Sequence, residues 1–204
     1  MILYFHPKIV DVVRTALEAF LHFLQVQSFQ KLTALRKRQN ELPMKVYEED
    51  ICKAVANSRV TIIAGDTGCG KSTQVPQYLL KHGFRKIAVT QPRRIASIAL
   101  AKRVGFETLN MFGSHVAYKI RFDGTATNAT RILFLTEGLL LRQMQMDTEL
   151  KQYDVIILDE VHERHLQSDL LLGLIAGKLR KISYYFFLLD LFQKRQRRHI
   201  CTEV

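Results

Sequence analysis

Nine residues, Gly65 to Thr73, have the types and the spacing needed to hold a chain of phosphates. They fit the P-loop pattern G-x-x-x-x-G-K-[ST]. Lys71 would neutralise the β- and γ-phosphates, and the Ser72 hydroxyl would bind Mg²⁺. A random match in a chain of this length is on the order of one in a hundred. The pattern therefore predicts a nucleotide site made by Gly65, Asp66, Thr67, Gly68, Cys69, Gly70, Lys71, Ser72 and Thr73.

A second group of reactive residues follows the apolar run Val155–Leu158, which ends in Asp159 and Glu160. If the run is a buried strand, Asp159 lies at the carboxyl edge of a sheet, where α/β folds bind their ligands. A carboxylate there can hold Mg²⁺, and a second one can polarise an attacking water. An acidic pair alone is found as often in a solvated turn as in a catalytic site. After a P-loop and an apolar strand, it predicts a catalytic pair.

The segments around these residues suit the task of positioning them. Val60–Ala64 is a β-branched run before the P-loop, and Gln74–Lys81 suits a helix after it, with a kink expected at Pro76. A strand, a glycine loop and a helix start in that order aim backbone N–H groups at one point, which attracts phosphate.

Strands and helices alternate along the rest of the chain. Apolar strands that do not alternate with polar residues argue for a mostly parallel sheet with helices on both faces, the α/β class. The expected strands are 87–90, 116–122, 131–136 and 155–158, and the expected helices are 47–56, 94–111 and 137–146.

An N-terminal helical extension, residues 1–41, is expected to precede a core domain of residues 42–180 and a tail of residues 181–204. Apolar residues from Asp11 to Phe29 recur at helical spacing, so this helix should pack on the domain or on a partner. Asn40–Pro43 interrupts the pattern and marks the domain edge. The apolar run Ile182–Leu189 suits a strand, and the basic residues after it suit a disordered tail.

The composition bounds the class of protein. The chain has 204 residues, 48% of them hydrophobic, and a formal net charge of +11. That charge favours a polyanionic partner such as nucleic acid, although a solvated basic surface explains it as well. Cys52, Cys69 and Cys201 show no disulfide or metal spacing, which favours a reducing compartment.

Targeting signals are weak in this sequence. Charges interrupt every apolar run well before the roughly 20 residues that a membrane span needs, and Met1–Phe5 lacks a basic region before it. We expect a soluble intracellular protein of the nucleus, the cytoplasm or both.

Asp159-Glu160-Val161-His162 is a DExH box, and here the chain resembles the DEAH-box RNA helicases, with Val161 where Ala is usual. A zinc site at His162 and His165 would need further ligands at suitable spacing, and none follows. The P-loop and the Gln74–Gln77 segment after it are also similar to that family. The resemblance covers residues 42–173 and implies a RecA-like P-loop NTPase domain that uses ATP and Mg²⁺.

Further motifs of the family follow in order. Thr90–Arg94 resembles motif Ia, Tyr118–Phe122 resembles the family's Y-x-I-R-F segment, and Thr136–Gly138 resembles motif Ib. The resemblance implies that three residues of motifs Ia and Ib contact the RNA backbone, a kind of contact made by cations and short donors, and that a further arginine contacts adenine. These residues are Arg93, Arg94 and Thr136 for RNA, and Arg103 for adenine.

The resemblance also implies partners and roles. The P-loop and the DEVH box are most similar to the branch of the family linked to nonsense-mediated mRNA decay, which implies RNA and mRNA-decay or other ribonucleoprotein factors as partners. Glu160 would be the general base, and His162 would relay the nucleotide state. The Gln-containing adenine-reading motif of DEAD-box relatives is absent, so several NTPs should be accepted.

The pattern stops after the DEVH box. No Ser-Ala-Thr motif follows Arg164, and the second RecA-like domain, with its arginine fingers, is absent. The chain therefore resembles the first half of a helicase, as a truncated or alternatively spliced product would. Two hypotheses follow: the ATP-binding half of an ATP-dependent RNA helicase, or an inactive nucleotide- or RNA-binding module that competes with the full-length enzyme. A transporter ATPase or a GTPase would carry motifs that this sequence lacks.

Overall fold

The computed structural model describes residues 7–66, 68–109, 114–177, 185–190 and 200–201. It divides into two units, residues 1–40 and residues 41–204. The first unit is one continuous helix, α1 (Pro7–Asn40), which confirms the expected helix and extends it through the basic stretch. Its apolar side chains are exposed at Val13, Leu17 and Phe20. What this helix packs on therefore stays a prediction.

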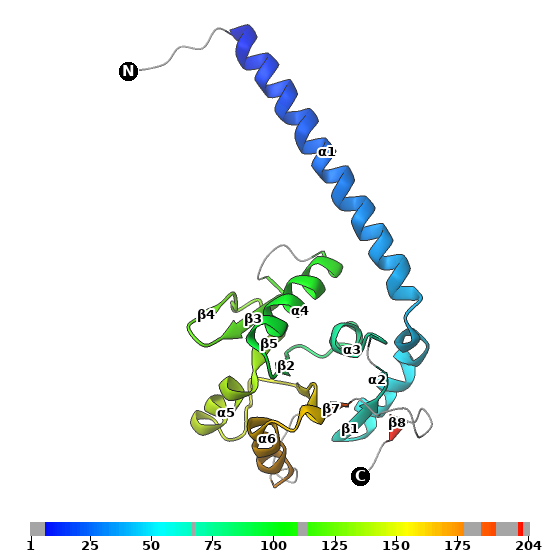
Figure 1. Ribbon diagram of the computed structural model, residues 1–204, viewed down its shortest axis with the longest axis vertical. Coiled ribbons are helices and arrows are strands. Elements are labelled where there is room, and N and C mark those ends of the chain that lie inside the picture. The colour runs from blue at the N-terminus through cyan, green and yellow to red at the C-terminus, as the bar shows by residue number, and fades with distance from the viewer. Residues whose placement is uncertain (1–6, 67, 110–113, 178–184, 191–199, 202–204) are drawn as a thin grey trace. The chain divides into compact units, whose positions relative to one another are not determined.

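The second unit is built on an eight-stranded sheet in the order β4-β3-β5-β2-β6-β7-β1-β8 (Figure 1). The six strands from β3 to β1 in this order pair in parallel, and β4 and β8 pair antiparallel at the two ends. This is the predicted mostly parallel α/β sheet. The strands are β1 (Val60–Ala64), β2 (Ile87–Gln91), β3 (Val116–Ile120), β4 (Asp123–Gly124), β5 (Ile132–Thr136), β6 (Val155–Leu158), β7 (Tyr185–Asp190) and β8 (Ile200–Cys201).

Helices cover the sheet on both faces. One face carries the 3₁₀ helix η1 and helices α2, α3 and α4, and the other face carries α5 and α6 (Figure 1). The short 3₁₀ helix η2 follows β6. The bounds are η1 (Pro43–Tyr47), α2 (Glu48–Asn57), α3 (Lys71–Lys81), α4 (Arg94–Glu107), α5 (Glu137–Met146), η2 (Val161–Glu163) and α6 (Leu166–Ala176).

The central strands show why both faces are covered. Successive side chains of a strand point to opposite faces. In β6, Ile157 belongs to the core under α2–α4, whereas Ile156 belongs to the core under α5 and α6. Phe134 and Leu135 of β5 divide in the same way. Strands buried on both faces need apolar residues at every position, which is the continuous pattern seen in the sequence.

Three elements differ in their bounds from the sequence-based expectation. The expected helix 94–111 ends at Glu107, because Leu109 has a φ of 57° and the Thr108 hydroxyl bonds the Val104 carbonyl. The expected strand 116–122 ends at Ile120, where Phe122 turns with a φ of 68° into β4. Helix α3 begins three residues earlier than expected, at Lys71, and continues through Pro76.

Strand β7 contains most of the apolar run that follows the family pattern. It lies between β1 and β6, with Phe186 in register with Val60 and with Ile156. The departure from the Ser-Ala-Thr pattern therefore falls in the middle of the sheet, beside both reactive segments. The basic residues 194–198 lie outside the described residues.

Candidate nucleotide site

The P-loop connects the carboxyl end of β1 to the first residue of α3. Gly68 and Gly70 have φ angles of 79° and 101°, in the left-handed region that favours glycine. A Cβ on Gly70 would also lie 2.9 Å from the Leu42 Cδ1 atom. The sequence motif therefore folds as expected at this turn. Thr67, one of the predicted binding residues, lies outside the described residues.

Lys71 is folded over this loop. Its side chain is buried, and its Nζ donates to the carbonyl oxygens of Gly65 at 2.6 Å and Asp66 at 2.9 Å. The Cys69 sulfur lies 3.6 Å from the same nitrogen. The ammonium group is thus held at the centre of the loop by weak acceptors, which phosphate oxygens would replace with stronger, charged ones.

Asp159 stands at the end of β6, beside the start of α3. It is 2% exposed and accepts hydrogen bonds from the Gln91 side chain and the Glu160 backbone N–H. Burial raises the pKa of this carboxyl above its ordinary value, and the Ser72 hydroxyl, the Gln91 and Glu160 donors and the Lys71 charge oppose the rise. The two reactive segments predicted from the sequence therefore lie close enough for Ser72 and Lys71 to act on the pKa of Asp159.

Glu160 occupies a strained position directly after Asp159. Its φ of 58° lies in the left-handed region, and Arg164 at the end of the DEVH segment has a φ of 50°. Such conformations cost on the order of 1–3 kcal/mol and collect at functional sites. Burial, and secondly the Asp159 charge, raise the pKa of Glu160. His162 Nε2 lies 3.4 Å from Glu160 Oε2.

The predicted RNA-contact residues lie at the same edge of the sheet. Arg93 and Arg94 follow β2, both exposed, and Thr136 ends β5, the strand paired with β2. Arg93 pairs with Glu163 of the DEVH segment at 3.1 Å, and its side chain remains 73% exposed. The fold thus places motifs Ia and Ib beside each other and beside the DEVH box. Their contact with RNA stays a prediction.

Arg103, the predicted adenine contact, is held by a residue that sequence reasoning missed. Its guanidinium pairs with Glu107, one turn further along α4. Glu107 is 5% exposed and also accepts from the Gln74 and Gln77 amides of α3, at 3.1 and 2.8 Å. This buried network ties the P-loop helix to the helix that carries Arg103. The available signal was the pair of glutamines on the buried side of α3.

Oxygen ligands for a metal ion are present at this site. The Ser72 hydroxyl and the Asp159 carboxylate are the hard donors that Mg²⁺ accepts, and sites that share Mg²⁺ with phosphates need only one or two protein carboxylates. A buried carboxylate whose pKa is raised by desolvation is also stabilised by a nearby cation. In the described part of the chain, no three His, Cys, Asp or Glu side chains are grouped to hold a metal ion.

Comparison with known proteins decides the family. The chain is 54% identical over 173 residues to the probable ATP-dependent RNA helicase DHX34 of Mus musculus, and 56% identical over 166 residues to that of Homo sapiens. It is 45% identical over 153 residues to the probable ATP-dependent RNA helicase DHR2 of Saccharomyces cerevisiae. The chain contains a DEAH-box helicase domain related to DHX34. No protein-family model matches it.

The match covers most of this chain and little of each DEAH-box relative. It takes in 85%, 81% and 72% of this chain, but only 15%, 14% and 20% of the mouse, human and yeast proteins. The recognition made from the P-loop and the DEVH box is confirmed, and so is the RecA-like fold. Val161, at the position where Ala is usual in this family, is 8% exposed and packs in the core under α5 and α6.

None of the described helices is both long enough and apolar enough to cross a membrane.

Proposed function

We propose that the chain is the ATP-binding part of an ATP-dependent RNA helicase, which binds and hydrolyses NTP with Mg²⁺ and contacts the RNA backbone. The observation that carries the proposal is that the buried Asp159 of the DEVH box lies at the start of the P-loop helix, where Ser72 and Lys71 both lower its pKa. The mouse and human relatives are named probable ATP-dependent RNA helicases, and this chain spans 15% and 14% of their lengths.

Each side chain at the carboxyl edge has a defined task in this proposal. Lys71 exchanges its carbonyl partners for the β- and γ-phosphate oxygens, and the P-loop N–H groups cradle the phosphate chain. Ser72 and Asp159 would hold Mg²⁺, which neutralises the charge that develops on the phosphates. Arg103, held by Glu107, would stack on the base.

Glu160 is the general base of the proposed hydrolysis. Its raised pKa makes its ionised form a better proton acceptor for an attacking water than an exposed glutamate would be. His162, 3.4 Å from that carboxylate, would sense its charge and relay the nucleotide state. Arg93, Arg94 and Thr136 would hold the sugar-phosphate backbone, because phosphate contacts need cations and short donors.

The competing proposal is a module that binds nucleotide or RNA without turnover and competes with the full-length helicase. One observation favours it: β7, between β1 and β6, carries Tyr-Phe-Phe-Leu-Leu-Asp instead of a segment that ends in Ser-Ala-Thr. In the family that motif couples hydrolysis to RNA. Such a module would keep the Lys71 and Asp159 geometry and lack RNA-stimulated hydrolysis.

An RNA-stimulated ATPase assay separates the two proposals. We expect turnover by the wild-type chain to fall to background in Glu160→Gln and to persist in the matched control Glu149→Gln, whose exposed carboxylate pairs with Lys151 away from the site. Nucleotide affinity should be kept in both variants. Nucleotide binding without turnover in the wild-type chain would establish the competing proposal. Comparable turnover of ATP and GTP would support the expected tolerance of several NTPs.

We further propose that the protein acts inside the cell, in the nucleus, the cytoplasm or both, with RNA and with mRNA-decay or other ribonucleoprotein factors. The names of the relatives as probable RNA helicases support RNA as a partner, and the resemblance of the P-loop and the DEVH box to the mRNA-decay branch of the family implies the other factors. Immunoprecipitation of the chain from nuclear and cytoplasmic fractions, with and without RNase, tests it. RNA-dependent recovery of mRNA-decay factors is the expected result.

A further inference from the structure

Basic residues precede three neighbouring strands at the amino edge of the sheet, opposite the nucleotide site. His115 comes directly before β3, Arg131 before β5 and Lys86 before β2, and these strands are adjacent in the order β3-β5-β2. Neighbouring strands lie about 4.8 Å apart. The amino ends of parallel strands therefore bring three basic residues together, and Arg85 adds a fourth.

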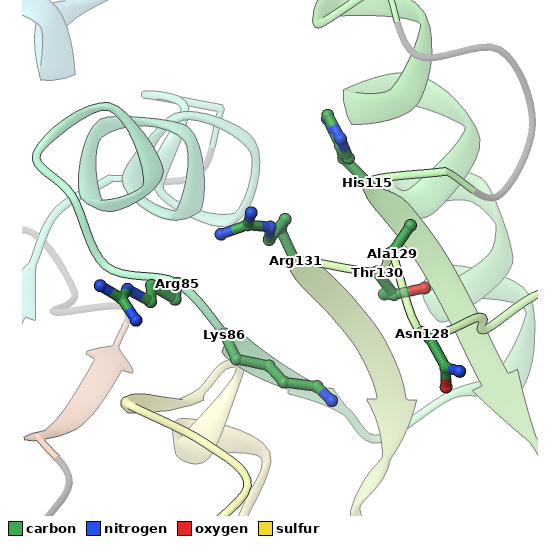
Figure 2. A pocket seen from close by; sticks show the side chains of 7 residues that line it. All are labelled: Arg85, Lys86, His115, Asn128, Ala129, Thr130 and Arg131. Carbon is green, nitrogen blue, oxygen red and sulfur yellow. The ribbon is translucent and has the colours of Figure 1, made fainter.

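These side chains line a pocket, here called the amino-edge pocket. It has a volume of about 290 Å³ and is lined by Arg85, Lys86, His115, Asn128, Ala129, Thr130 and Arg131. Figure 2 shows Arg131 between the Arg85–Lys86 segment and the segment that carries Asn128, Ala129 and Thr130. Since a water occupies about 30 Å³ in the liquid, the pocket has room for a phosphate group and part of its sugar.

The backbone that carries these cations is fixed by hydrogen bonds between strands. The His115 carbonyl accepts from the N–H groups of Arg131 at 2.7 Å and Ile132 at 2.8 Å. The Arg131 carbonyl accepts from the Ile87 N–H at 2.7 Å. Only the side chains must be ordered when an anion binds, which limits the entropic cost of binding.

The side-chain cations of the amino-edge pocket make no ion pair within the described part of the chain. No described acid makes an ion pair with Arg85, Lys86 or Arg131. Asp154, which precedes the next strand, β6, accepts instead from the backbone N–H groups of Arg85 at 2.6 Å and Lys86 at 3.1 Å. The side-chain cations are therefore available to an anion.

We propose that the amino-edge pocket binds the phosphate backbone of single-stranded RNA, at a second site away from motifs Ia and Ib. Two guanidinium groups, an ammonium and the Asn128 amide are donors that match phosphate oxygens. Ala129 is the one residue with an apolar side chain among the seven that line the pocket. The inference rests on RNA being a ligand of this chain, as in the proposed function.

The test compares two triple variants of the 204-residue chain. Arg85→Gln/Lys86→Gln/Arg131→Gln empties the pocket of permanent charge, and Lys53→Gln/Lys102→Gln/Arg142→Gln removes three exposed cations elsewhere. Fluorescence anisotropy measures binding of a labelled oligouridylate, of about 12 nucleotides, at several KCl concentrations. Affinity for a fluorescent ATP analogue shows that each variant is folded.

We expect the pocket variant to bind RNA about tenfold more weakly at about 100 mM KCl, with a slope of log K against log[KCl] that is shallower by about 2. The control variant should lose less than about threefold, because its three cations lie on three different helices, α2, α4 and α5, and do not line one pocket. ATP-analogue affinity should be unchanged in both variants.

Equal RNA affinity and equal salt slope in the two triple variants would overturn the inference. Binding of labelled poly-glutamate is measured in the same assay, and a pocket variant that loses poly-glutamate binding but keeps RNA binding would also overturn it. A third variant, Arg93→Gln/Arg94→Gln, keeps the two proposals distinguishable. If the third variant weakens RNA binding and the pocket variant does not, the result supports the proposed function and contradicts the second RNA site. If only the pocket variant weakens RNA binding, the result supports the second site and contradicts the RNA contact of motif Ia.

Discussion

The charged side chains at the carboxyl and amino edges of the same sheet differ in burial and in pairing. At the carboxyl edge, Lys71 and Asp159 are buried and each has several partners. At the amino edge, Arg85 and Arg131 are exposed, and no described acid pairs with them. Burying a charge costs several kcal/mol unless it is paired, whereas an exposed charge costs little.

This difference explains what each edge is suited to bind. Buried, partnered charges hold a small ligand in one geometry, as phosphoryl transfer requires. Exposed cations act through attraction that salt screens over about 10 Å, and they tolerate many positions of a flexible polyanion. The carboxyl edge should therefore be sensitive to single substitutions, and the amino edge should respond to net charge.

The largest expected effect is that of Lys71→Ala on nucleotide affinity. Loss of charge-assisted hydrogen bonds to phosphate removes about 3 kcal/mol, which is on the order of a hundredfold in Kd. Lys86→Ala makes the same change at the amino edge and should leave nucleotide affinity unchanged. Titration with a fluorescent ATP analogue measures both, and equal losses in the two variants would contradict the contrast between the edges.

A smaller effect is expected in the network behind the P-loop. Glu107→Ala removes one acceptor from each of the Gln74 and Gln77 amides, which keep only their Thr73 acceptors, at a cost of about 1–3 kcal/mol in the free energy of unfolding. Glu49→Ala, at an exposed position of α2, should cost less than about 0.5 kcal/mol.

Urea unfolding measures both of these variants. If Glu107→Ala were as mild as Glu49→Ala, the buried network would not hold α3 against α4, and Glu107 would not be the residue that positions Arg103.

The smallest expected effect is a pH dependence of stability at the carboxyl edge. Burial raises the pKa of Asp159 in the folded chain, so the folded state binds this proton more tightly than the unfolded state does. The free energy of unfolding should therefore fall as pH rises from about 4, the unfolded pKa, through the higher folded pKa.

The nucleotide-free wild type and Asp159→Asn, unfolded in urea at a series of pH values, test this dependence. The Asn variant should lack this part of the slope, and Asp50→Asn, an exposed change on α2, should keep it. Identical slopes for wild type and Asp159→Asn would show that burial does not destabilise the charged carboxylate.

Much of the site could be predicted because its signals are local. The P-loop needs Gly70 at one turn and Lys71 at the start of one helix, and both residues belong to one short sequence pattern. The uninterrupted apolar run before Asp159 likewise indicates a buried strand. Strand β7 could be expected from its apolar run, but its place between β1 and β6 depends on pairing with residues more than a hundred positions earlier.

The parts that could not be predicted depend on contacts between distant elements. Nothing in the sequence around Glu107 distinguishes it from other helix residues, and its role depends on the packing of α3, which carries Gln74 and Gln77. The left-handed conformation of Glu160 is not required by its residue type. The amino-edge pocket joins His115, Lys86 and Arg131, which lie far apart in the sequence and meet only because their strands are neighbours.

The central claim is that Ser72 and Asp159 together form the Mg²⁺ and phosphate site. Isothermal titration of ATP into the wild-type chain and into Asp159→Asn, each with Mg²⁺ and with EDTA, tests it most directly. We predict that Mg²⁺ tightens ATP binding at least about tenfold, or 1.4 kcal/mol, in the wild type and has no effect in the variant. Equal Mg²⁺ dependence in the two chains, or none in the wild type, would contradict the claim.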